Sequence, residues 1–323
     1  MKVSLISILK YLLFLGLAGL LLYWAFRGQD LHKMAKSVKE ANLFWILASV
    51  AACLLAHVFR ALRWNMLIKP LGYAPSAKNS FYAVMIGYLA NLAVPRMGEV
   101  SRCGVLKKTD QVPITPLVGT VFTERLSDLA MLVSITALTL LLEFGRIANF
   151  MYQYGWLRIK PLLNWKILVV FILVLVVLYL LKSFIKKWLN PIAKTLHSFK
   201  IGVLSFKQMP NKLAYLGYSA GLWACYFLST YLAFFALSST GNLSPIAALA
   251  ALVFGSLGMI VPVQGGIGAF HWMVAEGLSL YALPKADGLA FATLIHSSQI
   301  LVILLVGGTS LVLIATKSKT KVG

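Results

Sequence analysis

Charged side chains stand inside a long apolar segment that runs over Pro116–Leu142. Glu124, Arg125 and Asp128 lie roughly 12–18 Å from its start, if it is a helix that rises about 1.5 Å per residue. A charge at the centre of a membrane helix costs about 2.5–3.5 kcal/mol, so such residues default to paired or functional sites. Glu124 and Asp128 are four residues apart, so both carboxylates share one helix face and need a cationic partner there.

Candidate cationic partners follow a predicted interruption of the helix at Val94-Pro95. Arg96, Glu99 and Arg102 are spaced three apart, so a helix from Gly98 onward would align them on one face. We expect these arginines to form a mixed-charge cluster with the two carboxylates of the long segment. Arginine donors match the oxygens of a phosphate, so the cluster is a candidate phosphate site. The alternative is that the charges only pair with one another and fix helix packing.

A glycine-rich run, Gln264–Gly268, is the second candidate element. Gly265, Gly266 and Gly268 precede a helical segment that contains His271, and a helix N-terminus offers free N–H groups to an anion. We therefore include these four residues in the predicted substrate-binding set. The simpler interpretation is that the glycines only permit a tight turn and close helix contact.

Histidines at two places invite other interpretations. His271, Glu276, His296 and Gln299 fall on the last two apolar segments, where a metal site is conceivable but shows no metalloprotease spacing. A hydrogen-bonded packing role is favoured, since polar side chains commonly join transmembrane helices. His57 stands near three residues that we expect to anchor a cytoplasmic membrane interface: Arg60, Arg63 and Trp64. The cysteines, Cys53, Cys103 and Cys225, form neither a metal motif nor a disulfide framework.

The elements that must position these residues are membrane helices. Hydrophobic residues make up 60% of the chain and charged residues 12%, against about 25% charged in soluble domains. The apolar residues gather in stretches long enough to cross about 30 Å of hydrocarbon. The six clearest are Leu5–Phe26, Leu43–Phe59, Pro116–Leu142, Ile167–Leu181, Leu213–Leu237 and Leu289–Thr316. The first shows no small-residue cleavage site before Arg27, so we expect it to remain as a helix.

Basic residues far outnumber acidic ones, 30 to 9, which gives a net charge of +21. They gather at segment ends and short loops, where they meet anionic lipid, so nucleic acid is not expected as a partner. The densest basic loop is Lys182–Lys212, and we expect it to lie on the inner leaflet. This loop and the C-terminal lysines are both assigned to the cytoplasm. We expect a multi-pass protein of the cell inner (plasma) membrane with both termini cytoplasmic.

Two further apolar regions, Ser80–Val94 and Ser244–Leu283, are interrupted by proline and glycine. With the charge assignment, the first reads as a hairpin entering from inside and the second as one entering from outside. The predicted fold is an all-α integral membrane protein: a polytopic bundle of six full spans plus two broken re-entrant hairpins. Residues 1–160 and 161–323 then form an inverted repeat within a single transmembrane domain, a layout in which transporters place their sites at the broken helices.

The same elements carry a family resemblance. Arg60–Trp64, Pro95–Glu99 with Arg102, Glu124–Asp128 and Pro262–Gly268 resemble the transmembrane region of the lysylphosphatidylglycerol synthases, also called flippase-like. The resemblance covers nearly the whole chain. It implies a flippase for aminoacylated phosphatidylglycerol, whereas a separate soluble domain of the full-length synthases makes the lipid.

Two departures from the family pattern bear on function. The printed sequence ends at Gly323 without an aminoacyl-transferring domain, so the resemblance does not imply synthase activity. In many members a glutamate closely follows the glycine-rich element, where this chain has His271. The identity of the lipid head group therefore stays open.

Three hypotheses follow from the sequence. The leading one is a transporter of a phospholipid or lipid-linked intermediate, such as a polyprenyl-phosphate-type lipid, with the arginines receiving the anionic head group. In it, the carboxylates pair the arginines or receive a cationic head group. The second is an intramembrane enzyme acting on a lipid phosphate with Glu124 or Asp128 as base, although no catalytic or nucleotide motif and no cofactor is expected. The third is a non-transporting partner of a separate lipid-modifying enzyme.

Overall fold

The computed structural model describes residues 5–146 and 204–319, and every regular element in these two ranges is helical. This confirms the predicted all-α class and a polytopic helix bundle. Three described helices are long and apolar enough to cross a membrane: Leu43–Leu71, Ile114–Leu142 and Lys285–Thr316. Three predicted features lie outside the described ranges: the span Ile167–Leu181, the boundary between residues 160 and 161, and most of the basic loop Lys182–Lys212. Of that loop, only the residues from 204 onward are described.

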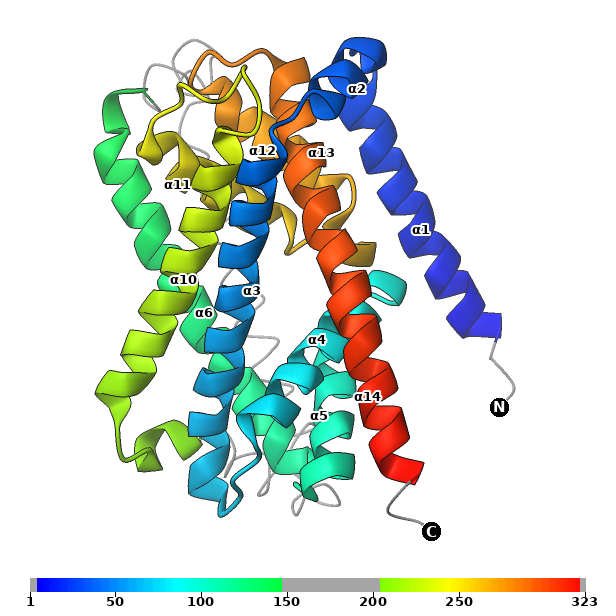
Figure 1. Cartoon of the computed structure of the whole chain (residues 1–323), viewed down its shortest axis with the longest axis vertical. Helices are drawn as coiled ribbons and strands as arrows, with labels where there is room; N and C mark the ends of the chain where they lie inside the picture. Colours follow the sequence, from blue (N-terminus) through cyan, green and yellow to red (C-terminus); the bar gives the residue numbers. More distant parts are fainter. Residues whose placement is uncertain (1–4, 147–203, 320–323) are drawn as a thin grey trace, which may run out of the picture.

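Long helices form the frame of the bundle (Figure 1). They are α1 (Leu5–Phe26), α3 (Leu43–Ile68), α6 (Ile114–Leu142), α10 (Lys212–Phe234) and α13 (Lys285–Val302) with its continuation α14 (Gly308–Lys319). A short amphipathic helix, α2 (Leu31–Lys39), joins the first two. The start of α1 and the end of α14 both lie in the lower half of the bundle in the view of Figure 1.

Local capping signals decide where several helices begin. The Asn42 side chain accepts from the Phe44 N–H at 3.0 Å ahead of α3. Asn211 accepts from the Ala214 N–H at 2.8 Å ahead of α10. Each such oxygen satisfies an N–H that has no partner in the first turn, which stabilises a helix typically by about 1 kcal/mol. The apolar helices therefore start at polar residues that the sequence places just outside them.

The first broken hairpin consists of α4 (Ala77–Ala93) and α5 (Met97–Asp110). The helix α4 ends at Ala93, Val94 is extended, and Arg96 turns the chain with a left-handed φ of 63°. Gly98 packs against the backbone of Gly87, where an added Cβ would collide with the Gly87 carbonyl oxygen. The two arms can fold back on each other because neither glycine carries a side chain at this contact.

The second broken hairpin consists of α11 (Pro245–Gly258) and α12 (Ala269–Ser279), with a short 3-10 turn at Gln264–Gly266 between them. Gly265, Gly266 and Gly268 all have positive φ, 57°, 75° and 85°. The predicted interruptions near Pro95 and Pro262 are confirmed, since each proline lies in the non-α-helical segment between the two arms of its hairpin.

The two hairpins occupy opposite ends of the bundle, α4 and α5 at the lower end and α11 and α12 at the upper end (Figure 1). Their tips meet inside it, because a Cβ added to Gly265 would lie 2.8 Å from Cδ2 of Leu92. The last turn of α4 therefore touches the glycine-rich turn of the other hairpin.

The helix that begins as α13 continues through a π-helical turn, Ile303–Gly307, into α14. Gly307 lies against α4, where an added Cβ would come within 2.9 Å of the Met85 carbonyl oxygen. The upper part of this long helix packs on α12 and α2, and the lower part packs on α4.

Candidate functional site

Glu124 of α6 is the centre of a buried charge cluster. Its side chain is fully buried and lies against arginines from two other elements. Arg60 Nη1 of α3 donates to its Oε1 at 2.6 Å, and Arg102 Nη1 of α5 lies 2.9 Å from its Oε2. A buried carboxylate is tolerated only with such partners, so this residue joins α3, α5 and α6 electrostatically.

Asp128, one turn further along α6, completes the pairing with α3. Arg60 Nη1 donates to its Oδ2 at 2.9 Å, and Arg63 Nη2 donates to its Oδ1 at 2.6 Å. Arg60 and Arg63 are three residues apart and so face the same side of α3, as Glu124 and Asp128 do on α6. Two arginines and two carboxylates therefore meet as matching pairs across the α3–α6 contact.

Arg102 is positioned by an aromatic partner as well as by the carboxylate. Its guanidinium lies 4.5 Å from the centre of the Trp64 ring, within the range of a cation–π contact. The indole Nε1 of Trp64 donates to Thr120 Oγ1 at 3.0 Å, which fixes the ring between α3 and α6. Both Trp64 and Thr120 are fully buried.

An outer ion pair lies on the more exposed side of the cluster. Arg125 Nη2 is 3.0 Å from Glu99 Oε1, and its Nη1 is 3.8 Å from Asp128 Oδ2. The Arg125 side chain is 45% exposed and the Glu99 side chain 31%. Arg125 can therefore move at a smaller cost than the buried arginines, because it already contacts the surroundings.

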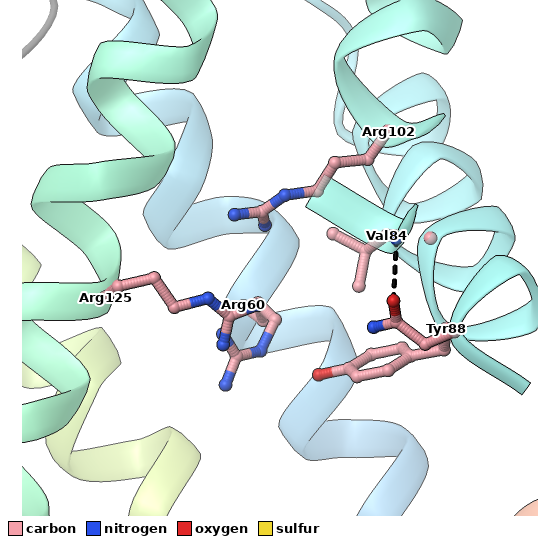
Figure 2. Close-up of a pocket in the computed structure, with 8 residues that line it drawn as sticks. Arg60, Val84, Tyr88, Arg102 and Arg125 are labelled. Carbon is pink, nitrogen blue, oxygen red and sulfur yellow. Dashed lines mark hydrogen bonds between the residues drawn. The ribbon is translucent and has the colours of Figure 1, made fainter. Parts of the chain in front are cut away.

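A small pocket opens beside these arginines, and Figure 2 shows Arg60, Arg102 and Arg125 around it. Arginine side chains, Tyr88, Asn91 and hairpin glycines line it, but no carboxylate does. Arg60 Nε, Arg102 Nε and Arg102 Nη2 are buried and have no hydrogen-bond partner among the described residues. The amide oxygen of Asn91 already accepts from the Gly98 N–H at 2.6 Å, which leaves its NH₂ group as a donor. The pocket therefore offers donors and positive charge, the chemistry that binds an anion.

An aromatic group adjoins the cluster on the side of α10. Arg60 Nη2 lies 3.5 Å from the Tyr226 hydroxyl, which is 3.3 Å from the Tyr88 hydroxyl. The ring of Tyr88 lies 4.5 Å from that of His57, which is buried. These contacts extend the polar network of the pocket from α3 to α4 and α10.

The sequence predicted the wrong surroundings for four residues in or near this site. Arg60, Arg63 and Trp64 do not anchor a membrane interface, because they are 5%, 0% and 0% exposed. The two arginines instead neutralise the α6 carboxylates. Arg96 is exposed and forms no ion pair with any described residue, so it lies outside the expected cluster. Its spacing was misleading because it precedes α5 in a left-handed turn and does not share the helix face of Glu99 and Arg102.

The glycine-rich turn forms a separate polar group. His296 Nε2 lies 2.9 Å from the Gly265 carbonyl oxygen, and the Gly268 N–H donates to His271 Nδ1 at 3.3 Å. The two imidazole rings are 5.0 Å apart, and both histidines are buried. These contacts fit the packing interpretation of the histidines, since each ring holds the backbone of the turn.

Glu276 has its own partners and does not contact the two histidines through any of them. Glu276 Oε1 pairs with Lys285 at 2.8 Å and accepts from the Trp272 indole at 3.0 Å, away from the histidines. Among the described residues, no group of three or more His, Cys, Asp and Glu side chains is arranged to hold a metal ion. The structure thus brings Glu99, Arg102, Glu124, Arg125 and Asp128 together, and places Gly265, Gly266, Gly268 and His271 at the other hairpin tip.

Comparison with known proteins adds a family match that spans most of the chain. The model described as the lysylphosphatidylglycerol synthase TM region matches residues 7–307. A UPF0104 membrane protein of Methanocaldococcus jannaschii, MJ1595, is 30% identical over 128 residues, which is 39% of this chain and 38% of that protein. The match thus spans less than half the length of this curated relative. No solved structure matches the chain.

Proposed function

Because this chain belongs to the family of the lysylphosphatidylglycerol synthase transmembrane region, we propose that it moves a phospholipid or lipid-linked intermediate between the two leaflets of a membrane. The observation that carries this proposal is the pocket beside the first hairpin, which, among the described residues, is lined by three arginines and by no carboxylate. Intramembrane ionisable residues that line a pocket commonly mark a substrate path.

The arginines receive the anionic part of the head group in this proposal. Arg102 lines the pocket and has two donors without a hydrogen-bond partner among the described residues, and Arg125 is exposed enough to turn toward an incoming phosphate. The carboxylates hold the arginines in place, since Glu124 already contacts three guanidinium groups. This arrangement favours a role for Glu124 in charge balance over direct binding of a cationic head group.

The two broken hairpins supply the conformational part of the mechanism. They lie at opposite ends of the bundle and touch at Leu92 and Gly265, an arrangement that suits an inverted repeat of residues 1–160 and 161–323. Rocking of one hairpin against the other would expose the arginine pocket first to one leaflet and then to the other. The proposed setting is the inner (plasma) membrane, with both termini cytoplasmic, and the proposed activity involves no chemical change of the lipid.

The test is leaflet exchange in liposomes that contain the purified protein. Labelled phosphatidylglycerol, its lysyl derivative and a polyprenyl phosphate are compared, because all three share a phosphate and differ in the rest of the head group. The wild-type chain should accelerate exchange of at least one of them. Arg125→Ala should reduce that exchange at least tenfold while the fold survives, because this arginine is half-exposed and Glu124 keeps all three of its arginine partners.

Two further variants distinguish an effect on the arginine pocket from a general effect on the fold. Arg102→Lys keeps the charge but loses the planar set of donors, so exchange should fall although the charge balance is unchanged. Arg146→Ala removes a similarly exposed arginine whose ion pair, with Glu143, lies outside the cluster, and it should exchange lipid like wild type. Exchange of no lipid by a folded wild-type protein, or appearance of a chemically altered lipid, would contradict the proposal.

A further inference from the structure

An open groove runs along the outside of the first hairpin, on a face of α5 that adjoins the one lining the arginine pocket. It holds about 240 Å³ and lies between α4, α5 and α14. Ser101, Gly104 and Lys108 of α5 form one wall, and Leu311 and Ile314 of α14 form the other. The end of α14 lies beside this hairpin at the lower end of the bundle (Figure 1).

The groove has the shape and polarity of a site for hydrocarbon. Gly104 lines it, and a Cβ added there would meet no atom within 4 Å. Next to the groove, Leu311, Val312 and Leu313 of α14 are 49%, 61% and 40% exposed. In a membrane helix, such exposed apolar side chains face acyl chains, so the groove is continuous with the lipid-facing surface.

One end of the groove is basic. Lys108 is exposed in the last turn of α5 and forms no ion pair with any described residue. Asp110, the acidic residue nearest in sequence to Lys108, accepts from Asn79 at 3.1 Å. The charge at this end therefore complements a negative head group.

The groove and the arginine pocket use different faces of α5. Ser101, Gly104 and Lys108 recur at three- and four-residue spacing on the face toward α14. Gly98 and Arg102, which line the arginine pocket, lie on the adjoining face, toward α4 and α6, and Arg102 is 3% exposed. A molecule in the groove would therefore contact the hairpin without reaching the buried charge cluster.

We propose that this groove binds one anionic membrane phospholipid, with an acyl chain in the notch at Gly104 and the phosphate of its head group at Lys108. The site is separate from the arginine pocket and does not depend on the transport proposal. The bound lipid braces α5 against α14, so anionic lipid stabilises the first hairpin.

The test is lipid binding to the whole purified chain, measured by native mass spectrometry in detergent. Phosphatidylglycerol and phosphatidylcholine with the same acyl chains are the probes. Wild-type protein should bind phosphatidylglycerol about fivefold more tightly, the effect of one lysine near a lipid phosphate. Lys108→Ala should remove that preference, and Gly104→Leu should reduce binding of both lipids because the added side chain fills the notch.

Lys107→Ala is the matched control, since Lys107 is an equally exposed neighbour that does not line the groove. It should bind both lipids like wild type. Any lipid held in the arginine pocket contributes equally to all variants, so differences between them report on the groove. Equal wild-type affinity for the two lipids, or unchanged binding in both Gly104→Leu and Lys108→Ala, would overturn the proposal.

Discussion

Replacing Glu124 with glutamine removes the negative charge at the centre of the buried cluster. The wild-type cluster holds four guanidinium groups and three carboxylates, which leaves one net positive charge. In Glu124→Gln the excess rises to two, and the arginines that contact Glu124 share one amide oxygen where they had a carboxylate. Arg102 is affected most, because Glu124 is its ion-pair partner among the described residues.

The expected cost follows from the burial of the pair. Breaking a buried ion pair by removing one partner typically costs about 3–5 kcal/mol, because the remaining charge stays buried without compensation. Glu124 and Arg63 are both 0% exposed as side chains, so water cannot easily take the place of the carboxylate. We therefore expect Glu124→Gln to lower the free energy of unfolding by about 3–5 kcal/mol.

The measurement is reversible unfolding in mixed detergent micelles, followed by tryptophan fluorescence. Glu40→Gln is the control, since Glu40 pairs with Lys36 at 3.9 Å and both side chains are more than 60% exposed. Its effect should stay below about 1 kcal/mol. Adding Arg102→Gln to Glu124→Gln restores the net charge and should recover part of the loss. A loss below about 1 kcal/mol in Glu124→Gln, or no recovery in the double variant, would refute the reasoning.

Three further predictions concern packing around the site. Gly98→Ala should lower the melting temperature and cost about 1–3 kcal/mol, because its Cβ collides with backbone, while the Gly104→Ala control has open space. Trp64→Phe should cost about 1 kcal/mol, and a double-mutant cycle with Thr120→Val should return a similar coupling energy; zero coupling would contradict the 3.0 Å hydrogen bond. Gly265→Ala should slow lipid exchange and lower the free energy of unfolding by about 1–3 kcal/mol, because a φ of 57° and the nearby Leu92 both oppose a side chain. Exchange at the wild-type rate with unchanged stability would contradict the contact between the hairpin tips.

The broken helices were predictable from the sequence because backbone chemistry leaves a local signal. Val94-Pro95 and Val261-Pro262 interrupt otherwise apolar runs, and the structure ends α4 at Ala93 and α11 at Gly258. The shared helix face of Glu124 and Asp128 also follows from their spacing alone. Helix boundaries and faces of this kind depend on neighbouring residues and need no knowledge of the tertiary fold.

The partners of the carboxylates were not predictable in the same way. Arg60 and Arg63 are followed by Trp64, a pattern that also marks membrane interfaces, so the sequence favoured the wrong environment. One signal was available: both lie well before the end of a helix that continues to Ile68. Their pairing with α6 depends on contacts between side chains that are 64 and 65 residues apart in the chain, which no local pattern encodes. The repeat boundary and the orientation in the membrane stay predictions.

The π-helical turn at Ile303–Gly307 has a geometric consequence for the whole bundle. A single wide turn accommodates one extra residue, and one residue corresponds to about 100° of rotation around a helix axis. The turn therefore resets the phase of the helix, so that α13 presents one stripe to α12 and α14 presents a differently rotated stripe to α4. Removing one residue from this turn would swing Leu311 and Ile314 away from the first hairpin while α13 kept its own contacts. The register of one wide turn thus sets which side chains of the last helix meet each half of the molecule.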